Sequence, residues 1–238
     1  MKRILTAAAV VTLCASASFA ATSIVNSKHD LSSGNVTAGI NIKSTTQGQI
    51  CIFCHTPHNA VRNVPLWNRN DPSTAPSAYA LYTSSATLTS VTKRAKLDSN
   101  SVSIFCLSCH DGTVSQIGSR VVNSGGNAMT MSGVWVAGGL TSDGKSLTND
   151  HPIGFDYSAA QAQDPTGLNP TATASNTITG GSYPTKTIFY KSTAVTGADN
   201  TGNFMECASC HVVHDNTNKP FLRKDNAGSA LCLACHIK

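Results

Sequence analysis

The stretch CIFCHTPH, residues 51–58, contains two cysteines separated by two residues and a histidine directly after the second cysteine. The same C-x-x-C-H pattern recurs as CLSCH (106–110), CASCH (207–211) and CLACH (232–236). The four copies contain eight of the nine cysteines, and the ninth, Cys14, lies near the N-terminus. A single kind of site must therefore account for the other cysteines and for the histidine after each pair.

Three kinds of site use cysteine pairs. A disulfide framework suits an exported protein, but it gives the histidines no role. Zinc sites are tetrahedral, and eight cysteines with four adjacent histidines are too many for two such sites. Covalent c-type haem attachment uses every residue of the motif, because two thiols bond to the haem vinyl groups and the imidazole binds iron. The sequence therefore predicts four covalently bound haem c groups, held by Cys51, Cys54, Cys106, Cys109, Cys207, Cys210, Cys232 and Cys235.

The histidine count supplies two imidazoles for each of four irons. Methionine is the alternative second ligand of haem iron, but only Met129, Met131 and Met205 lie beyond residue 1, so four methionine ligands are impossible. We therefore predict four bis-histidine haems. The motif ligands are His55, His110, His211 and His236, and the second ligands are His29, His58, His151 and His214.

The motifs and histidines occur in the same order twice. Each half has an isolated histidine, then C-x-x-C-H-x-x-H, then C-x-x-C-H. Flanking residues agree, since HNAVRNVPLWNRN (58–70) resembles HDNTNKPFLRKDN (214–226), and SIFCLSCH resembles SALCLACH. We predict a signal peptide at 1–20 and two duplicated two-haem units, at 21–140 and 141–238. The insertions at 71–102 and 157–203 are rich in turn-forming residues, which predicts loops with short strands such as KTIFYK.

The second histidine of CHTPH is predicted to serve a neighbouring haem. If residues 51–58 form helical turns, His55 and His58 lie on the same side, so His58 cannot reach the opposite face of its own haem. We expect His58 to bind the haem of Cys106 and Cys109. By the repeat, His214 then binds the haem of Cys232 and Cys235. The two isolated histidines, His29 and His151, complete the first haem of each unit, in an order that the repeat leaves open.

The composition predicts a fold with little regular structure. Aromatic residues make up 6% of the chain and charged residues 12%, and long stretches consist of small polar residues. Because such a chain has little apolar material for a core of its own, we expect a multihaem cytochrome fold with a haem-built core. It should be mostly irregular coil, with short helices at the C-x-x-C-H segments and few strands.

The N-terminus predicts export. Lys2 and Arg3 precede an apolar stretch at 4–17, and Ser18-Phe19-Ala20 suits signal-peptidase cleavage. A lipoprotein signal at Cys14 is the alternative, although Leu13 is bulky for one. No later stretch is apolar for long enough to span a membrane.

The charge balance does not predict a nucleic-acid partner. Removing Lys2 and Arg3 leaves 15 basic and 12 acidic residues, without a basic run. Four ferric haems would add about −4 through their propionates, bringing the net charge close to zero.

The segments CHTPH, PLW, CLSCHDGT and NDHPIG resemble the doubled-CXXCH multihaem cytochromes, and in particular the OmcE-type tetrahaem filament (nanowire) cytochromes of metal-reducing bacteria. The resemblance covers about residues 28–155 and 204–238. It implies a continuous stack of haems, a conductive extracellular homopolymer, and one distal histidine that crosses to the neighbouring subunit. The implied partners are upstream periplasmic or outer-membrane cytochromes and external electron acceptors.

His29 is the expected crossing ligand. Chain termini are usually mobile unless something binds them, and His29 lies nine residues into the mature chain. The tail of one subunit can complete the haem of Cys207 and Cys210 in the next, which gives an open head-to-tail filament. His151 then binds the haem of Cys51 and Cys54 in its own chain.

The expected function is extracellular electron transfer and not enzymatic catalysis, because two histidines on every iron leave no position open for a substrate. A soluble periplasmic tetrahaem electron shuttle is the main alternative. A multihaem reductase is a weaker one, since it would normally have a haem without a second histidine or a lysine in the motif position.

The ligand count leads to a spectroscopic prediction. All four irons in the native protein should be six-coordinate and low-spin, because each has two imidazole ligands. Electron paramagnetic resonance and visible absorption measure this directly. A substantial high-spin fraction would contradict the bis-histidine assignment and favour a reductase.

Overall fold

The computed structural model describes residues 24–40, 42–61, 65–70, 78–83, 97–98, 101–111, 120–125, 130–132, 146–178, 188–191 and 202–238. Most of these residues lie outside helices and strands. This low content of regular structure is compatible with the predicted multihaem cytochrome fold. The signal peptide, most of the first insertion and parts of the second lie outside the described residues. The division into units at 21–140 and 141–238 stays a prediction.

Each C-x-x-C-H motif lies on a short helix, as the sequence predicted. Two are 3-10 turns, η2 (Cys51–Phe53) and η7 (Cys232–Ala234), and two are α-helical, α3 (Val102–His110) and α6 (Cys207–Cys210). In three motifs the histidine amide donates to the carbonyl of the first cysteine, at 2.8 Å for His55, 3.1 Å for His211 and 2.9 Å for His236. The turn therefore brings both cysteines and the histidine close together.

Among the described residues, the strands form three separate two-stranded ladders. β1 (Lys43–Ser44) pairs antiparallel with β3 (Met131–Ser132), with Lys43 opposite Ser132. β2 (Ala80–Leu81) pairs parallel with β4 (Ser146–Leu147), with Ala80 opposite Ser146. β5 (Phe155–Asp156) pairs antiparallel with β6 (Phe204–Met205), with Phe155 opposite Met205. Because each ladder is two residues long, the strands join loops without forming a sheet core.

The second insertion differs from the prediction of loops at 157–203, because its first part is helical. α4 (Tyr157–Gln163) begins at an N-cap, Asp156, whose carboxylate accepts hydrogen bonds from the amides of Ser158 (2.9 Å) and Ala159 (3.3 Å). Capping of this kind stabilises the start of a helix. The polar composition of the segment had instead predicted a loop. α5 (Thr171–Ile178) follows. The strand expected at KTIFYK is reduced, among its described residues, to a bridge between Tyr190 and Phe204.

These helices belong to an apolar core built by the protein itself. Tyr157 stacks on Phe189 with ring centres 4.7 Å apart, and its hydroxyl donates to the carbonyls of Asn169 (2.7 Å) and Cys235 (3.2 Å). The fourth motif is thereby joined to the insertion. The buried residues of this cluster are Phe155, Tyr157, Ala160, Leu168, Ala174, Ile178, Ile188, Phe189, Met205, Leu231, Ala234 and Cys235.

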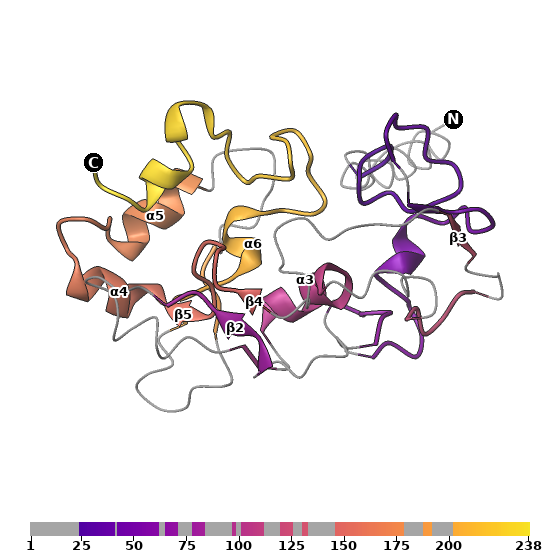
Figure 1. Cartoon of the computed structure of the whole chain (residues 1–238), viewed down its shortest axis with the longest axis horizontal. Coiled ribbons are helices and arrows are strands. Elements are labelled where there is room, and N and C mark those ends of the chain that lie inside the picture. The colour runs from indigo at the N-terminus through magenta and orange to yellow at the C-terminus, as the bar shows by residue number, and fades with distance from the viewer. Residues whose placement is uncertain are drawn as a thin grey trace, which may run out of the picture.

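The helices α3 and α6 meet near the centre of the molecule (Figure 1). The N-terminal loops and β3 lie at one end of the long axis, and α4, α5 and the C-terminus lie at the other (Figure 1). A smaller cluster of Tyr79, Leu97, Ile104, Leu107 and Leu147 packs around α3. Within the described ranges, no helix has both the length and the hydropathy needed to cross a bilayer. The pair α3 and α6 is therefore the point where the second and third motifs join.

The C-terminal core gives a stability prediction. Ile178 is 1% exposed in that core, so Ile178→Ala should lower the free energy of unfolding by about 2–4 kcal/mol. Denaturant unfolding of the haem-loaded protein, followed by far-UV circular dichroism, measures the change. Val36 is 80% exposed, and Val36→Ala is the control with little expected effect. Equal stability of the two variants would show that haem attachment alone stabilises this region.

Candidate haem-binding sites

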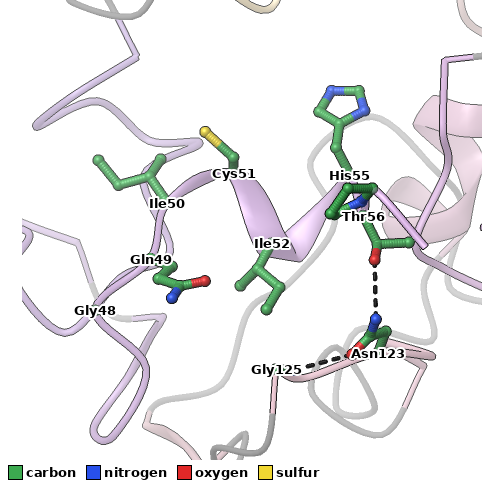
Figure 2. A pocket seen from close by; sticks show the side chains of 10 residues that line it. Gly48, Gln49, Ile50, Cys51, Ile52, His55, Thr56, Asn123 and Gly125 are labelled. Carbon is green, nitrogen blue, oxygen red and sulfur yellow. Dashed lines mark hydrogen bonds between the residues drawn. The ribbon is translucent and has the colours of Figure 1, made fainter.

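The first motif directs its cysteine and histidine to one side of the chain. Cys51 and His55 project the same way from the η2 turn, whereas Ile52 points toward Gly125 (Figure 2). Gly125 has φ +62°, and a Cβ there would meet Cδ1 of Ile52 at 3.1 Å, so glycine allows this close packing. The cavity lined by Cys51, His55, Pro57 and their neighbours has a volume of about 640 Å³, within the range of small-ligand pockets.

Proline carbonyls hold three histidine rings in one tautomer. Nδ1 of His55 lies 2.7 Å from the Pro65 carbonyl, and Nδ1 of His211 lies 3.1 Å from that of Pro220. Nδ1 of His151 lies 3.0 Å from the carbonyl of the next residue, Pro152. Because a carbonyl can only accept, Nδ1 must carry the hydrogen, which leaves the Nε2 lone pair for a metal.

The loops after the first and third motifs have matching geometry. The residues after the two prolines, Leu66 and Phe221, both have positive φ, of 64° and 57°. Their carbonyls accept from the residue after each motif histidine, namely Thr56 (3.0 Å) and Val212 (2.7 Å). The same backbone path therefore presents the proline carbonyl to the motif histidine in both places.

Six of the eight histidines form three ring pairs. His55 and His214 have ring centres 5.9 Å apart. His29 and His110 are 6.0 Å apart, and His151 and His236 are 6.4 Å apart. Every pair combines one motif histidine with one histidine from outside the motifs.

These separations fit two ligands of one haem iron. An imidazole nitrogen lies about 2 Å from its metal and the ring centre about 1 Å further, so opposed ligands have ring centres about 6 Å apart. All three pairs have this spacing, beside the cysteines that would hold the porphyrin. Within the described ranges, no three His, Cys, Asp or Glu side chains gather as around a bare metal ion. The ring spacing of the three pairs is compatible with haem.

His58 and His211 are the two remaining histidines. Both are exposed, and among the described residues neither ring contacts another histidine ring. The carbonyl of His58 accepts from the Thr56 hydroxyl at 2.8 Å. The structure thus fixes the backbone at His58 while its side chain remains at the surface.

The observed pairs differ from all the pairings that the sequence predicted. His110 is paired with His29 and not with His58, and His236 is paired with His151 and not with His214. The prediction assumed that both histidines of CHTPH lie on one helical turn. However, the η2 turn ends at its C-cap, Cys54, and His55 forms an isolated bridge with Trp67. The third motif is similar, since His211 is extended with φ −110° and ψ 146°.

The structure places the His29 ring beside His110 of the same chain, whereas the sequence predicted a partner for it in the adjacent subunit. The segment around His29 is not a free tail, because the buried Asp30 accepts from the amides of Asn26 (2.8 Å) and Ser32 (3.1 Å). The His29 ring stacks on Phe221 at 4.4 Å. Burial lowers the pKa of His29 to about 4, with further lowering from His110, so the ring is neutral and its lone pair is available.

The four motifs are neighbours in the order in which they occur in the sequence. Burial, and then repulsion from the Cys109 thiol, raise the pKa of Cys54 to about 12. Because this repulsion requires the two thiols to be close, the first motif lies beside the second. The Cys106 and Cys207 thiols are hydrogen-bonded, which joins the second and third motifs. Burial, and then Cys235, raise the pKa of Cys210 to about 12, so the third lies beside the fourth.

Buried charges between the motifs were not found from the sequence. Arg69 is 0% exposed and donates from Nη2 to the Ser108 carbonyl at 3.3 Å. Glu206, directly before the third motif, is 2% exposed. Charged residues beside a motif are usually solvated, so their sequence positions carried no sign of burial.

Known families support the haem assignment. Residues 201–238 match the doubled CXXCH motif family. No curated protein matches this chain. The match covers the third and fourth motifs and supports a multihaem c-type cytochrome, with haem bound covalently through C-x-x-C-H. Such a cytochrome functions in electron transfer.

The ring pairs can be tested one ligand at a time. His214→Ala and His29→Ala should each keep every covalent haem, because the motifs are unchanged. Each should convert one haem from six-coordinate low-spin to five-coordinate high-spin relative to the native assembly, as measured by electron paramagnetic resonance. Added imidazole should restore the low-spin signal. A fully low-spin spectrum in either variant would show that the corresponding pair does not bind iron.

Proposed function

We propose that this chain carries electrons through four bis-histidine haems and assembles head to tail into an extracellular filament. The observation that supports this most is the set of three histidine pairs with ring centres 5.9, 6.0 and 6.4 Å apart. Each pair offers an iron two nitrogen ligands and leaves no position for a substrate. Bound haem would supply a one-electron Fe(III)/Fe(II) couple.

The protein's own residues keep the attachment points close and their ligands fixed. The neighbouring thiol pairs Cys54/Cys109, Cys106/Cys207 and Cys210/Cys235 place each motif beside the next one in the sequence. Proline carbonyls and the stack of His29 on Phe221 fix ring orientation. A rigid ligand set changes little between oxidation states, which favours fast transfer between neighbouring haems.

The repeat suggests how one subunit joins the next. In both halves the isolated histidine pairs with the second motif, as in His29 with His110 and His151 with His236. The histidine after the third motif, His214, pairs back to the first motif of the preceding half, at His55. His58 occupies the position in the first half that His214 occupies in the second, and His211 corresponds in the same way to His55. If the same step is repeated between subunits, His58 pairs with His211 of the preceding subunit. Both side chains are exposed, as this contact requires.

A contact of this kind joins unlike surfaces and does not close on itself, so it produces an open filament. His58 therefore replaces His29 as the proposed crossing ligand. In such a filament the row of four haems continues across each joint. The proposed location is the cell surface, with upstream periplasmic or outer-membrane cytochromes as donors and external acceptors. This assembly corresponds to the OmcE-type filament cytochromes that the motifs resemble.

Electron-carrier function is tested on the native protein. Spectroelectrochemical titration should show that all four haems are reduced and reoxidised reversibly, each by one electron. Carbon monoxide should not bind to the reduced protein, because both axial positions are filled. Stoichiometric binding of carbon monoxide to one haem would reveal an open iron and favour a reductase.

The filament is tested with two single-histidine variants. His58→Ala should stop polymerisation, leaving single chains in electron micrographs and one high-spin haem per chain. His29→Ala is the matched control, because its ligand serves within the chain, and it should still form filaments. Filaments of normal length from His58→Ala, with every haem low-spin, would disprove this joint. A native protein that remains a single chain in solution would instead support the periplasmic shuttle.

A further inference from the structure

A buried carboxyl group lies between the second and third motifs. Glu206 is the N-cap residue of α6 and is 2% exposed. Its carboxylate accepts from the hydroxyl of Ser103 in α3 and from the Ser103 amide at 3.3 Å. The Cys207 amide donates to the same hydroxyl at 3.0 Å. Ser103 is 0% exposed, so Glu206 and Ser103 form the interior of the contact between α3 and α6.

This group lies beside both haem attachment points of the junction. Cys207 follows Glu206 directly, and its thiol is hydrogen-bonded to that of Cys106. In the proposed cytochrome each of these two thiols would be converted to a thioether at the edge of a porphyrin and would not bind iron. The nearest iron ligand in the sequence, His211, lies five residues after Glu206. With haem bound at both motifs, Glu206 would therefore lie close to the attachment points of two successive haems.

The groups that face the Glu206 carboxylate do not neutralise its charge. Among the described residues its carboxylate is bonded to hydroxyl and amide groups only, from Ser101, Ser103 and the Ser209 amide. Asp98 faces it as a second acid. Tyr190 and the two thiols also face it, and Arg223 is bonded to the Tyr190 hydroxyl at 3.2 Å. Burial raises the pKa of Glu206 to about 7.

The helical turn itself does not require an acid at this position. The residue before the first motif is Ile50, which is likewise the N-cap of its turn. Two motifs with similar geometry therefore differ by a buried negative charge. Glu206 also caps α6 by accepting from the Ser209 amide, so a variant that removes only its charge is needed to separate an electrical role from this structural one.

We propose that Glu206 lowers the reduction potentials of the two haems attached through Cys106 and Cys207, and that it takes up a proton when they are reduced. The inference rests on the proposed electron-transfer function. A nearby carboxylate stabilises the ferric state, which has one more positive charge than the ferrous state. When a donor cytochrome adds one electron, the carboxylate accepts one proton from water and becomes a carboxylic acid. The coupling is reciprocal: if haem reduction favours protonation of Glu206, protonation of Glu206 favours haem reduction by the same free energy. Protonation of Glu206 at lower pH therefore raises the reduction potentials of the two haems.

The test compares Glu206→Gln with the native protein by spectroelectrochemical titration over a range of pH. Above about pH 8 the native carboxylate is ionised, so Glu206→Gln should raise the potentials of two of the four haems. The same two potentials should vary with pH around neutrality in the native protein and lose that variation in the variant. Asp225→Asn, which removes an exposed acid, is the control and should change neither.

Two further variants keep the charge and separate this role from folding. Glu206→Asp should retain the low potentials and their pH dependence. Ser103→Ala removes a donor that stabilises the carboxylate, so it should move the midpoint of the pH dependence upward. Unchanged reduction potentials in Glu206→Gln with four low-spin haems would overturn the inference. A pH dependence with the same midpoint in Ser103→Ala as in the native protein would also overturn it. Either result would leave the reversible couples of the native protein intact, whereas an incorrect proposed function would show as carbon monoxide binding there.

Discussion

Three pairs of imidazole rings with centres about 6 Å apart mark the places where distant parts of this chain meet, and two ligands of one haem iron require this spacing. His29 is brought to α3, and the first motif is brought to the loop after the third. His151 is brought to the C-terminal turn. The described loops between these places contain few strands. If the pairs bind haem iron, coordination would hold these loops at their ends, in addition to the protein-built core at one end of the molecule.

The parts of this arrangement that depend on residue type could be predicted from the sequence. The C-x-x-C-H motifs predict covalent haem, which the family match supports, and the motifs lie on short helices as expected. Two histidines on every iron stays a prediction. The pairing of histidines could not be predicted, because it depends on where each turn ends. A helix continuing from Cys54 to His58 would have placed both rings on one side, whereas the bridge from His55 to Trp67 turns the chain away.

The second insertion shows a similar limit. Its small polar residues indicated loops, yet Asp156 caps a helix and Tyr157 binds the carbonyl of Cys235. The amphipathic pattern of such short helices is too weak to recognise without the surfaces that bury them. Glu206 and Arg69 were missed for the same reason, since burial of a charge is decided by tertiary contacts and not by neighbours in sequence.

The pair His55 and His214 has a consequence for the origin of the molecule. The isolated histidine of each half lies beside the second motif of the same half, but His214 lies beside the first motif of the other half. If the two halves arose by duplication and the pairs bind haem, a protein with one half would have carried a ligand that no site in the same molecule could use. Such a protein would have needed a second copy of itself to complete its haems, and association between chains would then be older than the chain in its present length.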